Sequence, residues 1–173
     1  MIAETERLIL RRYKKEDLQD LFEYLSDKEV VKYEPYKPFT LDETKENLEW
    51  RIGTEEMIAV ELKNSHKMIG NVYLGKREFE SLEMGYVFHR DYWGHGYALE
   101  SCKALIQQAF SNNGIHRIYA ECDPQNKRSW KLLEALGFQR EAYFRKNIYF
   151  WKDENEKPIW KDTYVYAKLN DDK

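Results

Sequence analysis

The sequence predicts one α/β domain over residues 1–173, with an antiparallel N-terminal half and a strand–helix–strand–helix centre. Three observations predict this fold. From Met57 onward, apolar and polar residues alternate with the period of two that is typical of half-buried strands. Two later segments, 97–110 and 130–136, repeat apolar residues at helical spacing instead. The chain of 173 residues, 42% of them hydrophobic, is large enough for one substantial core.

The composition excludes several classes of protein. Charged residues make up 34% of the chain, yet the formal net charge is only −3, whereas a general nucleic-acid binder is normally basic. No apolar run is long enough to span a bilayer, and no signal-peptide pattern is present. We therefore expect a cytoplasmic protein that binds neither nucleic acid nor membrane. Its two cysteines, Cys102 and Cys122, are expected to be reduced, packed thiols.

The N-terminal elements follow from local patterns. Residues 8–11 predict a short strand, and the apolar stripe of residues 18–25 predicts a helix. Ser26-Asp27 ends that helix, and a second short helical piece is expected to hold Val30 and Val31.

The next segment, Glu34 to Phe39, is a loop interrupted by prolines. It is either a plain connector or, because of its aromatic residues, a wall of a substrate cleft. Thr40 follows it, with Glu43 three residues later, and this capping-box pattern predicts a helix that runs to about Arg51.

The middle of the chain predicts a run of antiparallel strands. Residues 57–62 and 68–74 are joined by a hairpin turn at 63–67, and residues 82–88 continue the run. Helix 97–110 is expected to end at Asn113-Gly114 as a left-handed cap.

The C-terminal elements are a strand, a helix and a hairpin. The strand spans residues 115–122, and Gly137 closes the helix that follows it, with Phe138 against Leu133. Residues 138–148 and 159–169 predict a last pair of strands, joined by a charged connection.

The segment Asp91-Tyr92-Trp93-Gly94-His95-Gly96-Tyr97-Ala98 joins the end of a predicted strand to the start of a predicted helix. The first turn of a helix carries unpaired N–H groups and the positive end of the macrodipole, which together attract an anion. Glycines allow the backbone to approach a phosphate closely. We interpret the loop as a binding turn for a pyrophosphate-bearing cofactor; an ordinary tight turn is the alternative.

Several segments occur in one order: Glu83-Met84-Gly85-Tyr86, the loop at 92–98, Asn126-x-x-Ser129, and Leu132-Leu133-x-x-Leu136-Gly137-Phe138. Together they resemble the GNAT family of acetyl-CoA-dependent N-acetyltransferases. The opening residues 5–11 and the closing segment 160–166 resemble its branch of ribosomal-protein N-terminal acetyltransferases (the Rim type). The chain departs from the family at Asp91, where Gln or Arg is common; the adjacent Arg90 is the substitute we expect.

This resemblance implies a mixed, mostly antiparallel sheet that is flanked by helices and splayed between its fourth and fifth strands, here residues 82–88 and 115–122. Acetyl-CoA is then the implied co-substrate, with no metal, and its pyrophosphate lies on the loop amides. The residues expected to bind it are Val87, Phe88, Trp93, Gly94, His95, Gly96, Tyr97, Ala98, Asn126 and Ser129.

Glu83 is the leading candidate for the base that deprotonates the amine. Strand alternation groups its carboxylate with Gly85 and Val87, which is unusual for a solvated face, and burial would raise its pKa. Similar enzymes have an acidic residue at this place. An ion-paired surface glutamate is the alternative.

Two further residues have double interpretations. Asn126 is expected to cap the last helix, and in similar proteins the matching asparagine bonds the pantetheine arm. Ser129 lies one turn later, and the resemblance makes it a candidate for protonating the leaving thiolate; a surface hydroxyl is the alternative. Tyr143 is a rival proton donor or, more simply, a core aromatic.

The histidines and cysteines predict no metal site, because no Cys/His cluster has ligand spacing. The expected function is transfer of an acetyl group to a primary amine, either a protein N-terminal α-amine or a small-molecule amine such as a polyamine or amino acid. A non-catalytic acyl-CoA sensor is the alternative from another class. An ATP-binding domain is disfavoured, because no Gly-Lys-Ser/Thr follows the loop. The expected state is a monomer or homodimer.

Overall fold

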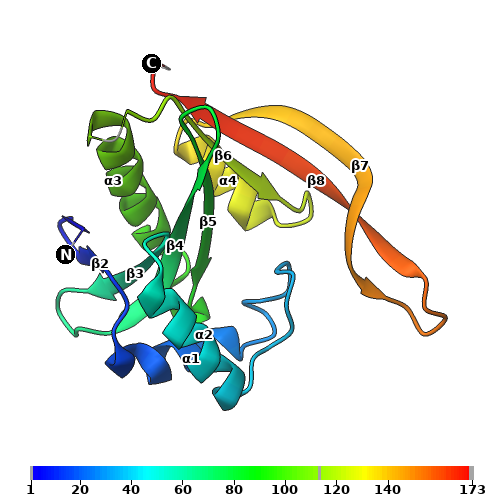
Figure 1. The fold of residues 1–173 in the computed structure, drawn as a ribbon, viewed down its shortest axis with the longest axis horizontal. Coiled ribbons are helices and arrows are strands. Elements are labelled where there is room, and N and C mark those ends of the chain that lie inside the picture. Colours follow the sequence, from blue (N-terminus) through cyan, green and yellow to red (C-terminus); the bar gives the residue numbers. More distant parts are fainter. Residues whose placement is uncertain (1, 113, 172–173) are drawn as a thin grey trace.

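The computed structural model describes residues 2–112 and 114–171. In this part of the chain, eight strands form one sheet in the order β1-β2-β3-β4-β5-β6-β8-β7 (Figure 1). The strands are β1 (Ala3–Glu4), β2 (Leu8–Arg11), β3 (Met57–Leu62), β4 (Met68–Arg77), β5 (Ser81–Phe88), β6 (Arg117–Cys122), β7 (Gln139–Lys152) and β8 (Pro158–Leu169). The helices are α1 (Leu18–Leu25), α2 (Leu41–Gly53), α3 (Tyr97–Asn112) and α4 (Lys127–Ala135), with short 3₁₀ turns η1 (Lys15–Asp17) and η2 (Arg90–Tyr92).

The sheet is mixed because β5 and β6 run parallel, whereas the other neighbouring strands are antiparallel. β4 and β5 pair from Arg77↔Ser81 to Gly70↔Phe88, along the whole of β5. β5 and β6 pair only from Ser81↔Arg117 to Glu83↔Tyr119. Beyond Glu83 the two strands diverge, which confirms the predicted splay.

Two apolar clusters pack against opposite faces of the sheet. The larger cluster contains Leu82, Met84 and Phe88 of β5 and buried residues of α3 and α4. The smaller cluster joins α1 and α2 to β3 and β4, and Val87 packs against it. The alternation predicted for β5 is therefore confirmed. Val87 faces the side of α1 and α2, and Glu83 and Gly85 share that side by strand alternation.

The capping box predicted for α2 is present. The Thr40 hydroxyl accepts a hydrogen bond from the Glu43 amide at 3.3 Å, and the Glu43 carboxylate accepts one from the Thr40 amide at 2.7 Å. The helical piece predicted at Val30 and Val31 is wrong, since these residues form turns on the Asp27 carbonyl. Pro35 disfavours helical geometry at the residue before it, so the chain continues as a loop.

The C-terminal strands are longer than the sequence predicts. β6 ends at Cys122, opposite Tyr164, so the part of β8 before Tyr164 pairs only with β7. These residues form a two-stranded ribbon that projects from the molecule (Figure 1). At its base, Gly137 has φ +84° and the Phe138 amide bonds the Leu133 carbonyl at 3.0 Å, as the predicted helix cap requires.

The cap predicted at the end of α3 is described in part. Gly114 has φ +63°, in the left-handed region, whereas Asn113 lies outside the described residues. Among the described helices, none is both long and apolar enough to cross a membrane.

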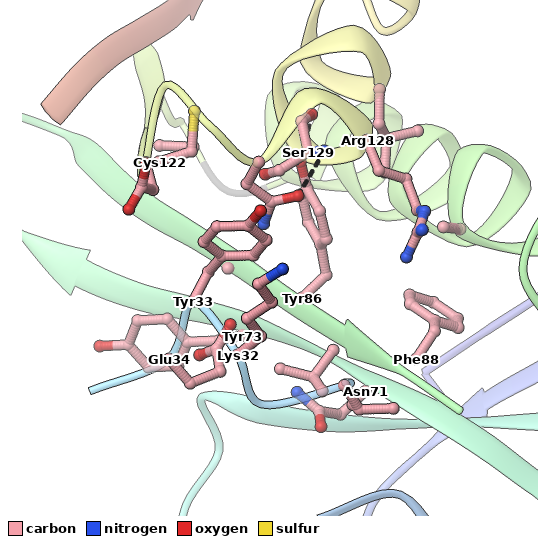
Figure 2. A pocket seen from close by; sticks show the side chains of 18 of the residues that line it. Lys32, Tyr33, Glu34, Asn71, Tyr73, Tyr86, Phe88, Cys122, Arg128 and Ser129 are labelled. Carbon is pink, nitrogen blue, oxygen red and sulfur yellow. Dashed lines mark hydrogen bonds between the residues drawn. The ribbon is translucent and has the colours of Figure 1, made fainter. Parts of the chain in front are cut away.

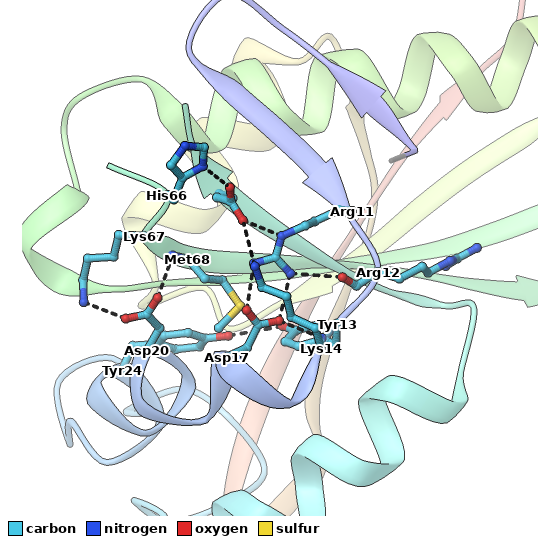
Figure 3. A network of polar contacts seen from close by, with 11 residues as sticks. Arg11, Arg12, Tyr13, Lys14, Asp17, Asp20, Tyr24, His66, Lys67 and Met68 are labelled. Carbon is cyan, nitrogen blue, oxygen red and sulfur yellow. Dashed lines mark hydrogen bonds and ion pairs between the residues drawn. The ribbon is translucent and has the colours of Figure 1, made fainter. Parts of the chain in front are cut away.

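A buried polar network fixes the N-terminal segments (Figure 3). The Arg11 guanidinium donates to both oxygens of Asp17, at 2.8 and 2.7 Å, and to Glu61 at 2.5 Å. Although burial alone would raise the pKa of Glu61, hydrogen bonds from His66 and Arg11 lower it. Arg11 thus connects β2, η1 and β3 through three hydrogen bonds.

Candidate active site

A cavity of about 1200 Å³ opens where β5 and β6 diverge. The end of β5, the loop after it, the start of α4, the 29–36 segment and the ribbon line it. Of the predicted site residues, Glu83, Val87, Phe88, Trp93, Gly94, Gly96, Tyr97, Ala98, Asn126 and Ser129 lie in its wall. His95 does not. It is exposed, its carbonyl accepts a hydrogen bond from Arg7 at 3.0 Å, and its ring lies beside Tyr97.

The glycine loop has the geometry of an anion cradle. Gly94 and Gly96 adopt φ +80° and +81°, a conformation that favours glycine. Within the described residues, the amides of Gly94 through Ala98 donate to no protein group, and they stand at the N-terminus of the 16-residue helix α3. The amide of Trp93 is engaged, because it donates to the Arg90 carbonyl at 3.1 Å. The free cradle therefore begins one residue later than the sequence predicts.

The expected substitute, Arg90, is engaged elsewhere than at this loop. Arg90 forms an ion pair with Asp27 at 3.2 Å. The Arg128 guanidinium from α4 lies instead over the Trp93 ring, 3.5 Å from its centroid. Arg128 also lines the cavity, so it supplies positive charge beside the cradle.

The backbone N–H and C=O groups of β5 point toward the gap at alternate residues. The His89 amide bonds the Ile69 carbonyl on β4, so the antiparallel ladder directs the backbone of His89 and Val87 toward β4. The backbone of Phe88 and Tyr86 points the other way, into the splay. The Phe88 carbonyl is taken by the Trp93 indole N–H at 2.8 Å, which leaves the Phe88 amide facing the gap.

Ser129 and Tyr86 meet at the start of α4 (Figure 2), where Asn126 also bonds Ser129. The Asn126 Oδ1 accepts a hydrogen bond from the Ser129 amide at 3.2 Å, which confirms Asn126 as the N-cap. The Tyr86 hydroxyl lies 3.0 Å from Ser129 Oγ and 2.9 Å from the Ser129 carbonyl. Ser129 is therefore not a free surface hydroxyl; it belongs to a half-buried hydroxyl pair inside the cavity.

Burial raises the pKa values of the groups around this pair. It raises the pKa of Cys122 to about 11, opposed by a hydrogen bond with Ser129. Burial also raises the pKa of Tyr86. The hydrogen bond with Ser129 acts to lower this pKa, whereas the charges of Cys102, Cys122 and Glu34 raise it further. Both groups are thus held in their protonated forms at neutral pH.

Glu83 lies in the cavity wall as an ion-paired residue. Its carboxylate is bonded to the guanidinium of Arg77, which also donates to the Tyr73 hydroxyl at 3.1 Å. Glu121, in the same wall, has a pKa raised by burial and then by the charge of Glu83. Two carboxylates, Glu83 and Glu121, therefore lie in the wall where β5 and β6 separate.

Tyr143 is neither a core aromatic nor part of the cavity wall. Its side chain is about half exposed on β7, and its hydroxyl donates to Asp162 at 2.6 Å. Sequence alternation could not place it correctly, because the ribbon that carries it has no core on either side.

Glu34 joins the site from the loop between α1 and α2, so this loop is a cavity wall rather than a plain connector. The carboxylate is partly buried and hydrogen-bonded by Tyr36. Burial raises the pKa of Glu34 to about 7, although Tyr36 and Arg51 act to lower it. The sequence analysis did not identify Glu34, Tyr86 or Arg128 as site residues. Only the aromatic residues around Glu34 indicated that this loop could be a cleft wall.

Comparison with known proteins agrees with this geometry. The model of the acetyltransferase (GNAT) domain matches residues 7–139. The uncharacterized N-acetyltransferase YnaD of Bacillus subtilis (strain 168) is 34% identical over 173 residues, which is 97% of this chain and 96% of that protein.

Solved structures give the same result. The crystal structure of an acetyltransferase (GNAT family) from Bacillus anthracis has a TM-score of 0.89 at 34% identity and covers 98% of both chains. The ribosomal-protein-S5-alanine acetyltransferase from Vibrio fischeri has a TM-score of 0.79 at 27% identity, over 98% of this chain and 97% of that chain. From the splayed sheet, the glycine cradle and these matches together, we conclude that the chain is an acyltransferase that belongs to the GNAT family of N-acetyltransferases.

Proposed function

We propose that this protein moves the acetyl group of acetyl-CoA directly to a primary amine, within the Rim-type branch of the family. The observation that carries the proposal is the row of free amides from Gly94 to Ala98 at the N-terminus of α3. Apart from His95, the residues that carry these amides lie in the wall of a cavity that also includes β5 and Ser129. A diphosphate at one end and a reactive thioester at the other fit this arrangement.

The residues of the chain that would hold coenzyme A follow from their free polar groups. The loop amides take the diphosphate, with Arg128 beside them. The Phe88 amide faces the gap, and the Asn126 side-chain NH2 is not used in capping α4, so both suit a pantetheine amide. Val87 and Tyr97 contribute apolar surface to the same wall.

Acetyl transfer then needs few additional groups, because two substrates held together react without a covalent enzyme intermediate. Ser129, aligned by Asn126 and by the Tyr86 hydroxyl, supplies a proton to the leaving sulfur. Glu83 is placed to receive the ammonium group of the acceptor, with Glu121 in the same cavity wall.

The proposed acceptor is the N-terminal α-amine of a protein. The similarity to the Vibrio fischeri ribosomal-protein-S5-alanine acetyltransferase supports this choice. A small-molecule amine is the second candidate, and the carboxylates of Glu34, Glu83 and Glu121 favour it, because they would attract a cationic molecule of any size.

An acceptor screen tests the proposed function. Purified protein is mixed with acetyl-CoA and with peptides, polyamines or amino acids, and released thiol is measured. We expect amine-dependent release with at least one class. Calorimetry with coenzyme A and with ATP is the companion measurement. Tight binding of coenzyme A without amine-dependent release would favour a sensor, and tighter binding of ATP would remove the proposal altogether.

A further inference from the structure

Three hydrogen bonds hold the loop that carries Glu34, and one of them reaches the segment before α4. The Tyr33 hydroxyl donates to the Gln125 carbonyl at 3.3 Å, on the segment that leads into α4. The Glu34 amide bonds the Val31 carbonyl at 2.9 Å, and the Phe39 amide bonds the Leu25 carbonyl at 3.0 Å. These bonds hold the Glu34 side chain in the wall of the same cavity as Tyr86 and Ser129 (Figure 2).

The charged and titratable groups that face Glu34 come from three elements. Tyr36 of the same loop hydrogen-bonds the Glu34 carboxylate, and the charge of Arg51 from α2 acts to lower the pKa of Glu34. The charge of Glu34 in turn raises the pKa of Tyr86 on β5. Arg51 is already bound by Asn47 at 2.5 Å and by the Tyr13 hydroxyl at 2.9 Å. Among the described residues, Glu34 therefore has no ion-pair partner.

Glu83 differs from Glu34 in this respect. Its carboxylate is neutralised by direct contact with Arg77, which also bonds Tyr73. A carboxylate that must accept a proton should not be stabilised in its charged form by an adjacent cation. Glu34 meets this requirement better than Glu83. It is partly buried in the cavity wall, it forms no ion pair with any described residue, and burial raises its pKa to about 7.

We propose that the carboxylate of Glu34 is the catalytic base that takes the proton of the acceptor ammonium, while the Glu83–Arg77 pair positions the acceptor. This assignment deepens the proposed function and rests on it. The sequence analysis predicts Glu83 as the base, because strand alternation reveals which β5 residues share a face but not which loop lies beside them.

The proton and electron balance of the step is complete with the groups present. An ammonium R–NH3⁺ gives one proton to Glu34, and the free electron pair on nitrogen forms a bond to the thioester carbonyl carbon. The carbon–sulfur bond breaks with its electron pair on sulfur. Ser129 gives its hydroxyl proton to the sulfur and takes the second proton from nitrogen, so Ser129 ends unchanged. Glu34 then releases its proton to water, so one proton is produced for each amide formed.

The test compares Glu34→Gln with Glu83→Gln and with Glu78→Gln, an exposed glutamate away from the cavity. With the acceptor of highest turnover in the screen above, Glu34→Gln should lower kcat about 100-fold at pH 7. The KM for acetyl-CoA should change less than about twofold. In the wild type, kcat should fall on the acid side with a midpoint near 7, and Glu34→Gln should lack this limb. Glu34→Asp should recover part of the rate and restore the limb.

A second measurement needs no acceptor. In protein labelled with ¹³C at the glutamate carboxyl, the resonance that is missing in Glu34→Gln should titrate with a midpoint near 7. A normal carboxylic-acid midpoint would overturn the assignment, as would a Glu34→Gln enzyme that keeps the wild-type rate and acid limb. If the wild type acetylates no amine, the proposed function fails, and the NMR titration still reports separately on Glu34.

Discussion

The two ends of the Asn126 side chain differ, because only one of them is hydrogen-bonded within the described residues. Its Oδ1 accepts the Ser129 amide and completes the cap of α4, whereas its NH2 group is directed to no described protein acceptor. The two interpretations of Asn126, as a helix cap and as a ligand of the pantetheine arm, are therefore compatible, because its oxygen and its NH2 group can serve one each. The cap could be predicted from sequence spacing; the Tyr86 hydroxyl beside Ser129 could not, since alternation assigns Tyr86 simply to the core face.

Substitutions at Asn126 can separate these tasks. Asn126→Asp keeps an oxygen that caps the helix, so stability should stay within about 0.5 kcal/mol of the wild type. The same change removes the NH2 donors and adds a charge, so coenzyme A should bind about 10-fold more weakly, the value of one hydrogen bond. Asn126→Ala should lose both affinity and about 1 kcal/mol of stability. Chemical unfolding and calorimetry measure the two quantities; equal affinity for all three proteins would remove Asn126 from the cofactor site.

Glu34 also has a consequence for stability. Its pKa is raised to about 7 in the folded state by burial, from an ordinary value of 4.5. The folded protein therefore holds this proton more tightly, and the associated stability is present below pH 4.5 and lost as the pH rises through 7. Glu34→Gln should match the wild-type melting temperature at pH 5 and exceed it at pH 8. Glu78→Gln is the matched control, and a constant difference at both pH values would contradict the expectation.

At the scale of elements, the period of the apolar residues predicted strand boundaries best where the strand packs against the core. The buried strand β3 and the half-buried β5 were predicted to within one residue. The ribbon of β7 and β8 was predicted too short, because Phe144, Tyr149 and Trp160 are exposed and follow no core face. The turns at Val30 and Val31 are closed by the Asp27 carbonyl and are followed by Pro35, and no apolar period reveals them.

The loop that precedes α3 permits a direct test. Gly96 has φ +81°, and an added Cβ would meet only Arg7 at 3.4 Å, so the obstacle to a side chain is conformation rather than space. Gly96→Ala should cost about 1–2 kcal/mol of backbone strain, or shift the loop and weaken coenzyme A about 10-fold. Gly53→Ala, at a helical glycine with open surroundings, should leave the affinity for coenzyme A unchanged and should not lower stability. Unchanged affinity in Gly96→Ala would argue against the cradle.

At the scale of the whole molecule, the N-terminal half is joined to the sheet by the Arg11 network. Removing the guanidinium leaves Asp17 and Glu61, both less than 5% exposed, without their principal cation. Arg11→Met should therefore cost about 3–5 kcal/mol of folding free energy in urea unfolding. Arg12→Met, which removes an exposed ion pair, should cost less than about 1 kcal/mol. Similar losses for the two variants would contradict this explanation.

The cavity could be predicted only in part, because its two sides differ in how they are built. The side that we propose binds coenzyme A comes from a strand, its following loop and α4, whose order and spacing are visible in the sequence. The side that we propose binds the acceptor combines the α1–α2 loop with β4 and the distant ribbon. No sequence spacing connects those segments, so their meeting appears only in the folded chain.

The short contact between β5 and β6 has one more consequence. Only three residue pairs join these strands before they separate, so the strands form no backbone hydrogen bonds to each other beyond that point. A pantetheine arm that bonds the Phe88 amide would supply hydrogen bonds that a neighbouring strand would otherwise make. Ligand binding and sheet completion then become one thermodynamic event. Coenzyme A should slow hydrogen exchange at Tyr86 and Phe88 more than at Val87, whose amide is already shielded by β4.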